Sequence, residues 1–291
     1  MVGGSIGAAL FSLERFVLRR NAGGLFGRLP FLPYLALRSL LYAGVILVIN
    51  AVVDWLMSGQ FMVVGSIDFL FSLGLVVVGN LLFSVNDLLG PATLFAFAAG
   101  RYYEPRIEER ALLFIDMRSS TAIAERLGEL GFLNLLNRFI VDLSLAIAEA
   151  GGEIHKYVGD EIIATWRLAP GMNEAGCVRA CFVALDRLRA QGPAYEREFG
   201  LVADFRAGLH CGPVAVGELG YLEIALIGDT MNTAARIQQA CRETDNRVLA
   251  SAALLDRLAA LPPGVTQRRL GALEMRGKER ALELHVLEAG G

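Results

Sequence analysis

Two long apolar runs dominate the first third of the chain. Residues 36–57 and 62–85 are almost continuously hydrophobic, and each run approaches the roughly twenty residues that a helix needs to cross a bilayer. The link between them is short and uncharged, so the pattern predicts a helical hairpin that spans the membrane. A glycine-rich apolar stretch at residues 2–18 is compatible with a third span or with a segment at the membrane surface.

Arginines indicate the orientation of this hairpin. Basic residues are enriched on the cytoplasmic side of membrane helices, and five precede or open the first run: Arg15, Arg19, Arg20, Arg28 and Arg38. Both ends of the hairpin are therefore expected in the cytoplasm, as in a multi-pass protein of the plasma (inner) membrane that contacts membrane lipid. We divide the chain into a membrane domain at 1–86, a helical connector at 87–107 and a cytoplasmic domain at 108–291.

Beyond residue 107 the pattern changes to short apolar strands and amphipathic helices. A turn at Cys211–Pro213 is expected between two of the strands. Strands are predicted at 111–115, 202–209, 214–216 and 282–287, and helices at 132–149 and 173–190. The order of strands and helices predicts an α+β fold, a ferredoxin-like α/β sandwich in which helices pack on one antiparallel sheet.

Composition narrows the function classes. The chain is 54% hydrophobic with a mean hydropathy of +0.48, and the excess lies before residue 100. Its formal net charge of -3 argues against a nucleic-acid partner bound mainly through charge. The four cysteines include no C-x-x-C pair, which favours buried free thiols over a disulfide, and the three scattered histidines argue against zinc.

A predicted hairpin at residues 153–166 carries more charge than a structural turn requires. Gly159 and Asp160 are a turn signal between two β-prone runs, and Lys156, Asp160 and Glu161 crowd the tip. An acid on a rigid tip can hold a hard cation such as Mg²⁺. The alternative is an ordinary turn with solvated charges.

A second acid, Asp116, follows the strand at residues 111–115 and precedes the hydroxyls of Ser119 and Thr121. An acid at a strand end, followed by hydroxyls that open a helix, combines a cation site with an anion site. The alternative is that Asp116 or Ser119 only caps the helix. If Asp116 and Asp160 end adjacent strands, two bridged Mg²⁺ ions relieve their repulsion and suit phosphoryl chemistry on a nucleotide.

Two further segments carry polar groups, although neither spacing is specific alone. Asn232 and Arg236 are four residues apart on one face of a predicted helix that Asp229 can cap. Arg276 and Lys278 lie in a basic turn before the last strand, which either grips a polyphosphate or is a solvated loop.

Together these motifs closely resemble the class III adenylyl/guanylyl cyclase family. The matching segments are Leu-Phe-Ile-Asp-Met-Arg-Ser-Ser-Thr ending at Thr121, His-Lys-Tyr-Val-Gly-Asp-Glu ending at Glu161, Gly-Leu-His-Cys-Gly-Pro-Val ending at Val214, and Ile-Gly-Asp-Thr-Met-Asn-Thr-Ala-Ala-Arg ending at Arg236. The resemblance implies that the ribose 3′-hydroxyl of a nucleoside triphosphate attacks its own α-phosphate and that pyrophosphate leaves.

The resemblance also implies roles for single residues. Asp116 and Asp160 match the acids that bind two Mg²⁺ or Mn²⁺ ions per active site, with the backbone carbonyl of Met117 as a further ligand. Asn232 matches the residue that orients the ribose. Arg236 matches the residue that stabilises charge on the α-phosphate in the transition state.

Base recognition is the point where the chain departs from the family. Lys156 matches the lysine that donates to adenine, which favours ATP. Seven residues before Asn232 the family usually has an Asp or Thr that accepts from the adenine amino group, but here that residue is Ala225. Discrimination against GTP is therefore expected to be weaker. Either Arg276 or Lys278 lies where the family places a residue that binds the triphosphate.

In the family the two acids come from one subunit and the Lys, Asn and Arg from the other. The resemblance therefore implies a head-to-tail homodimer with active sites at the interface. Together with the predicted membrane spans, it implies a membrane-bound enzyme that converts ATP to 3′,5′-cyclic AMP and pyrophosphate. The alternatives are a guanylyl or mixed-specificity cyclase, a catalytically silent receptor that only binds nucleotide, and a diguanylate cyclase. The last is suggested by residues 158–161 but fits the other motifs poorly.

Overall fold

The computed structural model describes residues 104–168, 175–219, 223–273 and 281–290, together with short helical pieces between residues 33 and 81. The chain divides into two compact units, Met1–Arg101 and Tyr102–Gly291. The predicted segment at 2–18 lies outside the described residues, as do most of the two predicted spans and residues 87–103 of the predicted connector.

The second unit alternates strands and helices along the chain. Its elements are β1 (Arg106–Met117), α5 (Ser120–Glu149), β2 (Glu153–Val158), β3 (Glu161–Arg167), α6 (Gly176–Phe199), β4 (Phe205–Leu219), β5 (Glu223–Ile227), α7 (Asp229–Glu243), β6 (Val248–Ser251), α8 (Ala252–Leu255), β7 (Val265–Leu273) and β8 (Leu282–Ala289). The strand β1 begins inside the stretch that the sequence assigned to a helical connector.

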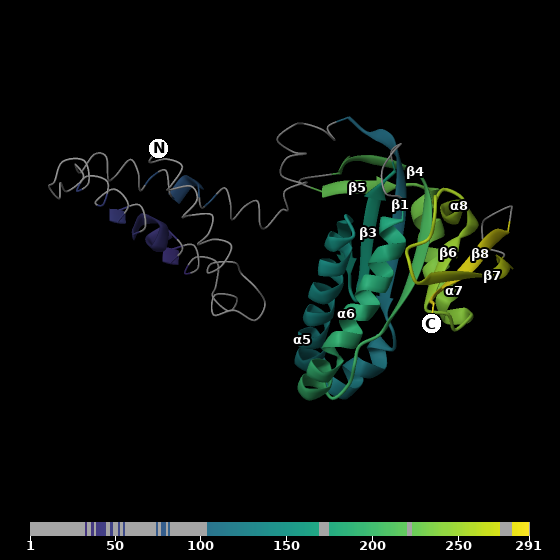
Figure 1. The fold of residues 1–291 in the computed structure, drawn as a ribbon, viewed down its shortest axis with the longest axis horizontal. Helices are drawn as coiled ribbons and strands as arrows, with labels where there is room; N and C mark the ends of the chain where they lie inside the picture. The colour runs from purple at the N-terminus through teal and green to yellow at the C-terminus, as the bar shows by residue number, and fades with distance from the viewer. Residues whose placement is uncertain are drawn as a thin grey trace. The chain divides into compact units, whose positions relative to one another are not determined.

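The described strands form one sheet in the order β2-β3-β1-β4-β6-β8-β7, and β5 pairs with β4 (Figure 1). All these pairs are antiparallel except β4 with β6. The segment from β1 to β4 is a βαββαβ unit with the strand order β2-β3-β1-β4, which is the ferredoxin-like arrangement. The predicted mixed α+β fold is therefore confirmed for this unit.

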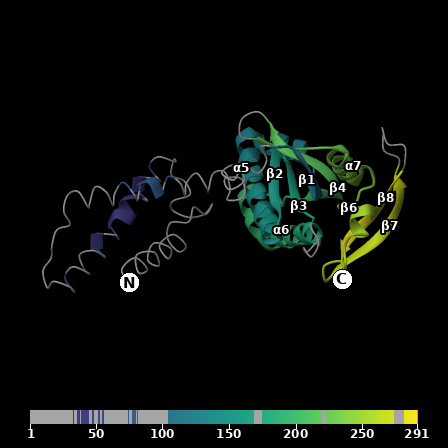
Figure 2. The same cartoon turned by 90° about the horizontal axis from the view of Figure 1, so that it is seen from above.

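Helices cover both faces of the sheet. Because side chains alternate along a strand, β1 turns Leu113 and Ile115 to a core shared with α5 and α6, and Leu112 and Phe114 to the opposite face, which Ala234 of α7 covers. Figure 2 shows α5 and α6 together on one side of the sheet and α7 on the other. The core under α5 and α6 is the larger of the two.

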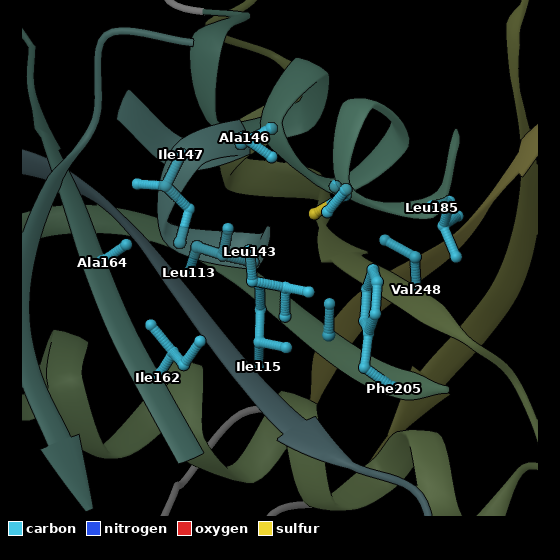
Figure 3. Packing of buried hydrophobic residues seen from close by; sticks show 14 of the residues in the cluster. Leu113, Ile115, Leu143, Ala146, Ile147, Ile162, Ala164, Leu185, Phe205 and Val248 are labelled. Carbon is cyan, nitrogen blue, oxygen red and sulfur yellow. The ribbon is translucent and has the colours of Figure 1, made fainter. Parts of the chain in front are cut away.

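That larger core is filled by aliphatic and aromatic side chains from every layer. Figure 3 shows Leu143 and Ile147 of α5 packed over Leu113, Ile115 and Phe205 of the sheet. These side chains are fully buried. The four cysteines are also buried free thiols, as predicted.

Several predicted boundaries differ from those in the structure, among them the start of α5, which is Ser120 rather than residue 132. The strand β4 runs unbroken through the predicted turn at Cys211–Pro213, since β1 pairs with it along Phe205–Val216. Pro213 falls between the stretch of β4 that pairs with β6 and the stretch that pairs with β5, where a missing N–H is tolerated. The helix α6 continues past residue 190 to Phe199, with Pro193 inside it.

One helix among the described residues, α5, is long and apolar enough to cross a membrane. It is instead a core helix, because Leu135, Phe139 and Leu143 on one side of it are completely buried against the sheet. It kinks at Gly128, whose φ of 71° is in the left-handed region. The membrane domain predicted at residues 1–86 is not confirmed by the described helices.

A buried ion pair lies near the start of β1. The guanidinium of Arg110, with a side chain 3% exposed, donates to Glu108 at 2.7 Å and 2.9 Å and to Glu153 at 3.1 Å. Burial raises the pKa of Glu108, but the hydrogen bond and charge of Arg110, together with Arg167 and Arg106, hold it below the usual value. The pair contributes stability only while both charges are present.

Candidate active site

Three carboxylates meet where β1 ends and the β2-β3 hairpin turns. Gly159, with a φ of 62°, makes the turn after β2 and places Asp160 at the tip and Glu161 at the start of β3. Asp116 lies directly opposite Glu161 in the β1-β3 register. The predicted hairpin is thus present, and it brings Asp160 beside Asp116.

The electrostatics of this cluster are those of crowded acids. Burial raises the pKa of Asp116 from 3.8 to about 6, and the charge of Asp160 and a hydrogen bond between the two side chains add to the rise. Burial likewise raises the pKa of Glu161 to about 7, with further contributions from Asp116 and Asp160. A neighbouring cation would reverse these shifts because it favours the ionised carboxylates.

The donor set fits a hard divalent cation. Oδ2 of Asp160 is shielded from solvent and has no hydrogen-bond partner among the described residues, and a buried carboxylate oxygen of this kind is costly without a partner. No three His, Cys, Asp or Glu side chains in the described ranges are placed to hold one ion. Mg²⁺ is commonly bound by one or two carboxylates with water and substrate phosphates completing its shell, which matches the pair Asp116 and Asp160.

The residues predicted after Asp116 form the start of α5. The side chain of Met117 is buried in the core, so only its backbone is left to serve as a ligand. Ser119 has a φ of 58° and occupies the N-cap position, but its side chain makes no capping hydrogen bond. Its carbonyl accepts from the N–H of Ile123 at 3.0 Å. Ser119 and Thr121 are exposed, so both hydroxyls can meet an external ligand.

The other predicted residues lie on three separate elements. Asn232 is exposed and Arg236 half-buried on α7, whose N-cap is Gly228 rather than the predicted Asp229. Lys156 is exposed on β2, and Ala225 is half-buried on β5 opposite Gly217. Asp116 and Asp160 are thus brought together, whereas Lys156 lies on β2, and Asn232 and Arg236 lie on α7. Arg276 and Lys278 lie outside the described residues.

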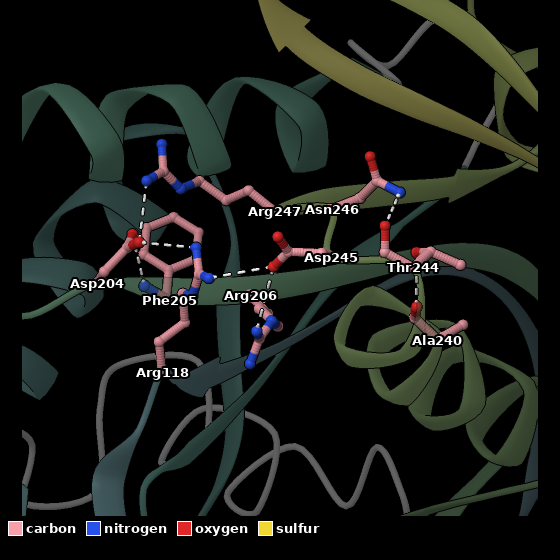
Figure 4. Close-up of polar contacts among 9 residues, drawn as sticks. All are labelled: Arg118, Asp204, Phe205, Arg206, Ala240, Thr244, Asp245, Asn246 and Arg247. Carbon is pink, nitrogen blue, oxygen red and sulfur yellow. Dashed lines mark hydrogen bonds and ion pairs between the residues drawn. The ribbon is translucent and has the colours of Figure 1, made fainter. Parts of the chain in front are cut away.

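A network of ion pairs surrounds the end of β1 (Figure 4). Arg118 contacts Asp204 at 3.5 Å and Asp245 at 3.2 Å, Arg247 contacts Asp204 at 2.9 Å, and Arg206 contacts Asp245 at 3.7 Å. These side chains are partly exposed, so each pair contributes little energy. Together they join the segment after Asp116 to β4 and to the turn after α7.

Three further residues lie near the two acids. Glu161 is in register with Asp116 on one side, and Arg206 is in register with it on the other. Gln238 of α7 hydrogen-bonds the Asp116 side chain. Glu161 adjoins a motif acid and was visible in the sequence, whereas Arg206 and Gln238 required the strand pairing and the packing of α7.

Comparison with known proteins identifies the family. The model of the adenylate and guanylate cyclase catalytic domain matches residues 102–289. The chain belongs to this cyclase family. "Adenylate cyclase 2" of Rhizobium meliloti (strain 1021) is 36% identical over 208 residues, which are 71% of this chain and 57% of that relative, so the chain spans just over half of its length.

Solved cyclase structures share the fold. A bacterial light-regulated adenylyl cyclase aligns with 63% of this chain and 91% of its own at a TM-score of 0.52 and 23% identity. The guanylate cyclase domain of RhGC from Catenaria anguillulae, in complex with GTP, aligns with 64% of this chain and 100% of its own at a TM-score of 0.52 and 22% identity. These structures share the fold alone; the family match over residues 102–289 confirms the resemblance of the sequence to this cyclase family.

Proposed function

We propose that this protein is an adenylate cyclase that converts ATP to 3′,5′-cyclic AMP and pyrophosphate. The observation that carries the proposal is the pair Asp116 and Asp160, two adjacent acids with an unpartnered buried oxygen, on a chain that also presents Asn232 and Arg236 from one helix. Membership of the cyclase family and the relative named adenylate cyclase support it. A structural role alone leaves the repulsion of the acids unexplained.

Asp116 and Asp160, with the backbone carbonyl of Met117, would hold two Mg²⁺ or Mn²⁺ ions per active site. When bound, these ions supply a lowered pKa of the ribose 3′-hydroxyl and neutralise the triphosphate. Asn232 orients the ribose, and the Arg236 guanidinium stabilises the charge that develops on the α-phosphate. Ser119, Thr121 and one basic residue of the turn at 276–278 bind the phosphates.

Substrate selection in this proposal rests on Lys156. A lysine donates hydrogen bonds but cannot accept one, which suits adenine N1. Ala225 offers no side-chain acceptor for the adenine amino group, and its cross-strand neighbour is Gly217, so that side of the pocket adds no acceptor either. Because neither Ala225 nor Gly217 has a side chain that accepts a hydrogen bond, this pair favours a second candidate function, a cyclase of mixed ATP and GTP specificity.

We further propose a homodimer with active sites at the subunit interface. Ile107, Ala215 and Ile227 lie in register across β1, β4 and β5, and Ile107 and Ile227 are 70% and 59% exposed. Leu219 on the same face of β4 is 55% exposed. An apolar patch of this kind on a sheet marks an interaction surface, and a second copy would bring the acids of one subunit to Asn232 and Arg236 of the other.

The membrane assignment is also a proposal, with a membrane domain at 1–86, a connector to residue 107 and a cytoplasmic cyclase domain at 108–291. Large apolar side chains are exposed on the described helical pieces of the first unit, among them Leu40 at 69%, Val48 at 63% and Val78 at 55%. Such exposure suits contact with lipid tails. Membrane lipid is therefore proposed as a partner of residues 1–86 in a multi-pass protein of the inner membrane.

The deciding experiment is nucleotide turnover by the full chain with Mg²⁺ or Mn²⁺. Cyclic AMP should form from ATP, and Asp160→Ala should abolish it while leaving the dimer intact. A dimeric wild type that makes no cyclic nucleotide, or that matches Asp160→Ala, would leave the alternative of a silent nucleotide-binding receptor. Rates on ATP and GTP side by side test the mixed specificity, and Lys156→Glu should shift the preference toward GTP.

Membrane attachment has its own test. After cell lysis the full chain should sediment with membranes and resist extraction by high salt, whereas a chain that begins at Glu104 should remain in the supernatant. Release of the full chain by salt alone would contradict the proposed spans. Comparing the turnover of the two chains also measures whether residues 1–103 regulate the cyclase domain.

A further inference from the structure

One buried polar side chain near the acids has no role in the mechanism above. Gln238 lies on α7, is only 8% exposed, and hydrogen-bonds the Asp116 carboxylate. The donor must be the glutamine amide, because an ionised carboxylate can only accept. An amide buried in a helix is costly unless it is bonded, so its partner Asp116 accounts for its presence there.

The packing of α7 fixes this amide in place. Gly208 of β4 lies so close to the helix that a Cβ there would stand 2.3 Å from the backbone nitrogen of Gln238. One turn on, Sγ of Cys241 donates to the carbonyl of Ala207 at 3.2 Å, and at the helix start Oγ1 of Thr230 donates to the carbonyl of Pro213 at 2.6 Å. The helix is therefore attached to β4 at both ends of the segment that includes Gln238.

The same helix presents its proposed catalytic residues in another direction. An α-helix turns about 100° per residue, so Gln238 is about 240° on from Asn232 and about 200° on from Arg236. Asn232 is exposed, whereas Gln238 points back to the sheet of its own chain. One rigid helix thus touches an acid of its own subunit and presents Asn232 and Arg236 away from it.

We propose that Gln238 is a positioning residue for the metal centre. Its amide holds one oxygen of Asp116, which leaves the other oxygen for Asp160 and the cation, and it ties the orientation of Asp116 to the helix that carries Asn232 and Arg236. The proposal rests on the proposed function, because it takes Asp116 as a metal-binding acid. Groups that orient a metal ligand commonly change metal affinity by about 10–100-fold when they are removed.

The test measures metal binding without turnover. Gln238→Met keeps the length of the side chain and removes the donor, and its neighbour Gln239 is exposed, so Gln239→Met is the matched control. Mn²⁺ is titrated into the full-length dimer without nucleotide, and free Mn²⁺ is read by electron paramagnetic resonance. We expect Gln238→Met to bind Mn²⁺ about 10-fold more weakly than wild type and Gln239→Met to bind it like wild type.

Kinetics give a second readout that a purely structural role would not produce. The Mn²⁺ concentration for half-maximal cyclic AMP formation should rise in Gln238→Met, while the rate at saturating Mn²⁺ stays near that of wild type. If Gln238→Met melts well below wild type, Gln238→Asn replaces it, since that amide is one carbon too short to reach Asp116. It should show the same weakened binding.

Wild-type Mn²⁺ affinity in a folded Gln238→Met or Gln238→Asn protein would overturn the proposal. That outcome is distinct from failure of the proposed function, in which the wild type itself forms no cyclic nucleotide. The Mn²⁺ titration of the wild type and of Asp160→Ala establishes whether the acids bind the metal, whatever the turnover. The Mn²⁺ affinity of Gln238→Met, compared with that of wild type, then decides whether metal binding by Asp116 depends on Gln238.

Discussion

Because the carboxylates of Asp116, Asp160 and Glu161 crowd together, we expect the protein to be less stable without a bound metal ion than with one. Replacing Asp116 by Asn removes one charge from the cluster and keeps an oxygen that can accept from Gln238. The repulsion from Asp160 and Glu161 is then relieved. We expect Asp116→Asn to be more stable than wild type in EDTA near pH 8, and to lose both metal binding and cyclase activity.

The structure sets the size of the effect. The rise in the Asp116 pKa from 3.8 to about 6 corresponds to about 3 kcal/mol at about 1.4 kcal/mol per pH unit. Asp116 is only half-buried, and solvent screening reduces this to about 1 kcal/mol. For a folded unit of this size, about 1 kcal/mol moves the melting temperature by about 2–4 °C.

The pH dependence follows from the direction of the shift. Asp116 has a higher pKa in the folded than in the unfolded protein, so the folded state binds more protons between about 3.8 and about 6. Its favourable contribution is complete below the lower value and is lost as pH rises through the upper one. The advantage of Asp116→Asn should therefore be complete at pH 8, fall to about half at pH 5 and vanish below about pH 3.8.

The assay is thermal unfolding of the full chain, followed by tryptophan fluorescence, in EDTA at pH 5 and pH 8. Added Mg²⁺ should raise the melting temperature of the wild type at pH 8 and leave Asp116→Asn unchanged. A variant less stable than wild type at pH 8, or an advantage of equal size at both pH values, would refute the electrostatic reasoning.

Three further predictions concern the surroundings of the site. Gly208→Ala should cost about 3 kcal/mol of unfolding free energy and most of the activity, because a Cβ at 2.3 Å forces α7 off the sheet. Glu108→Gln should cost about 3 kcal/mol by leaving Arg110 poorly compensated, a difference that shrinks as pH falls through the lowered pKa of the wild-type Glu108 carboxyl. Glu161→Gln should flatten the pH dependence of metal-free stability between about pH 4.5 and about pH 7. Each is measured by urea unfolding.

Controls for these variants come from the same chain. Gly192 lies inside α6, where an added Cβ would meet Val202 at an ordinary 3.7 Å, so Gly192→Ala should stabilise by about 0.5–1 kcal/mol. Equal effects of Gly208→Ala and Gly192→Ala would contradict the close approach of α7 to β4. A Glu108→Gln deficit that does not shrink as pH falls through the lowered pKa of Glu108 would show that packing, not charge, explains the loss.

Local sequence patterns were sufficient for several parts of this protein. The hairpin around Gly159 and Asp160 follows from a glycine turn between β-prone runs, and the position of Asp116 follows from an apolar strand that ends at an acid. These signals depend only on neighbouring residues, so they hold in any fold that buries the apolar segments. The motif spacing around Asn232 and Arg236 then indicated the family before any tertiary contact was known.

Tertiary structure decided what depends on residues far apart in the chain. The turn predicted at Cys211–Pro213 is absent because β1 pairs with β4 through it, and a local pattern cannot reveal that partner. Gln238 has no motif of its own: Gly208 lets α7 approach β4, and only then does its amide meet Asp116. The sequence alone determined which acids are present and which elements carry them. The packing of α7 on the sheet decided how Asp116 is held.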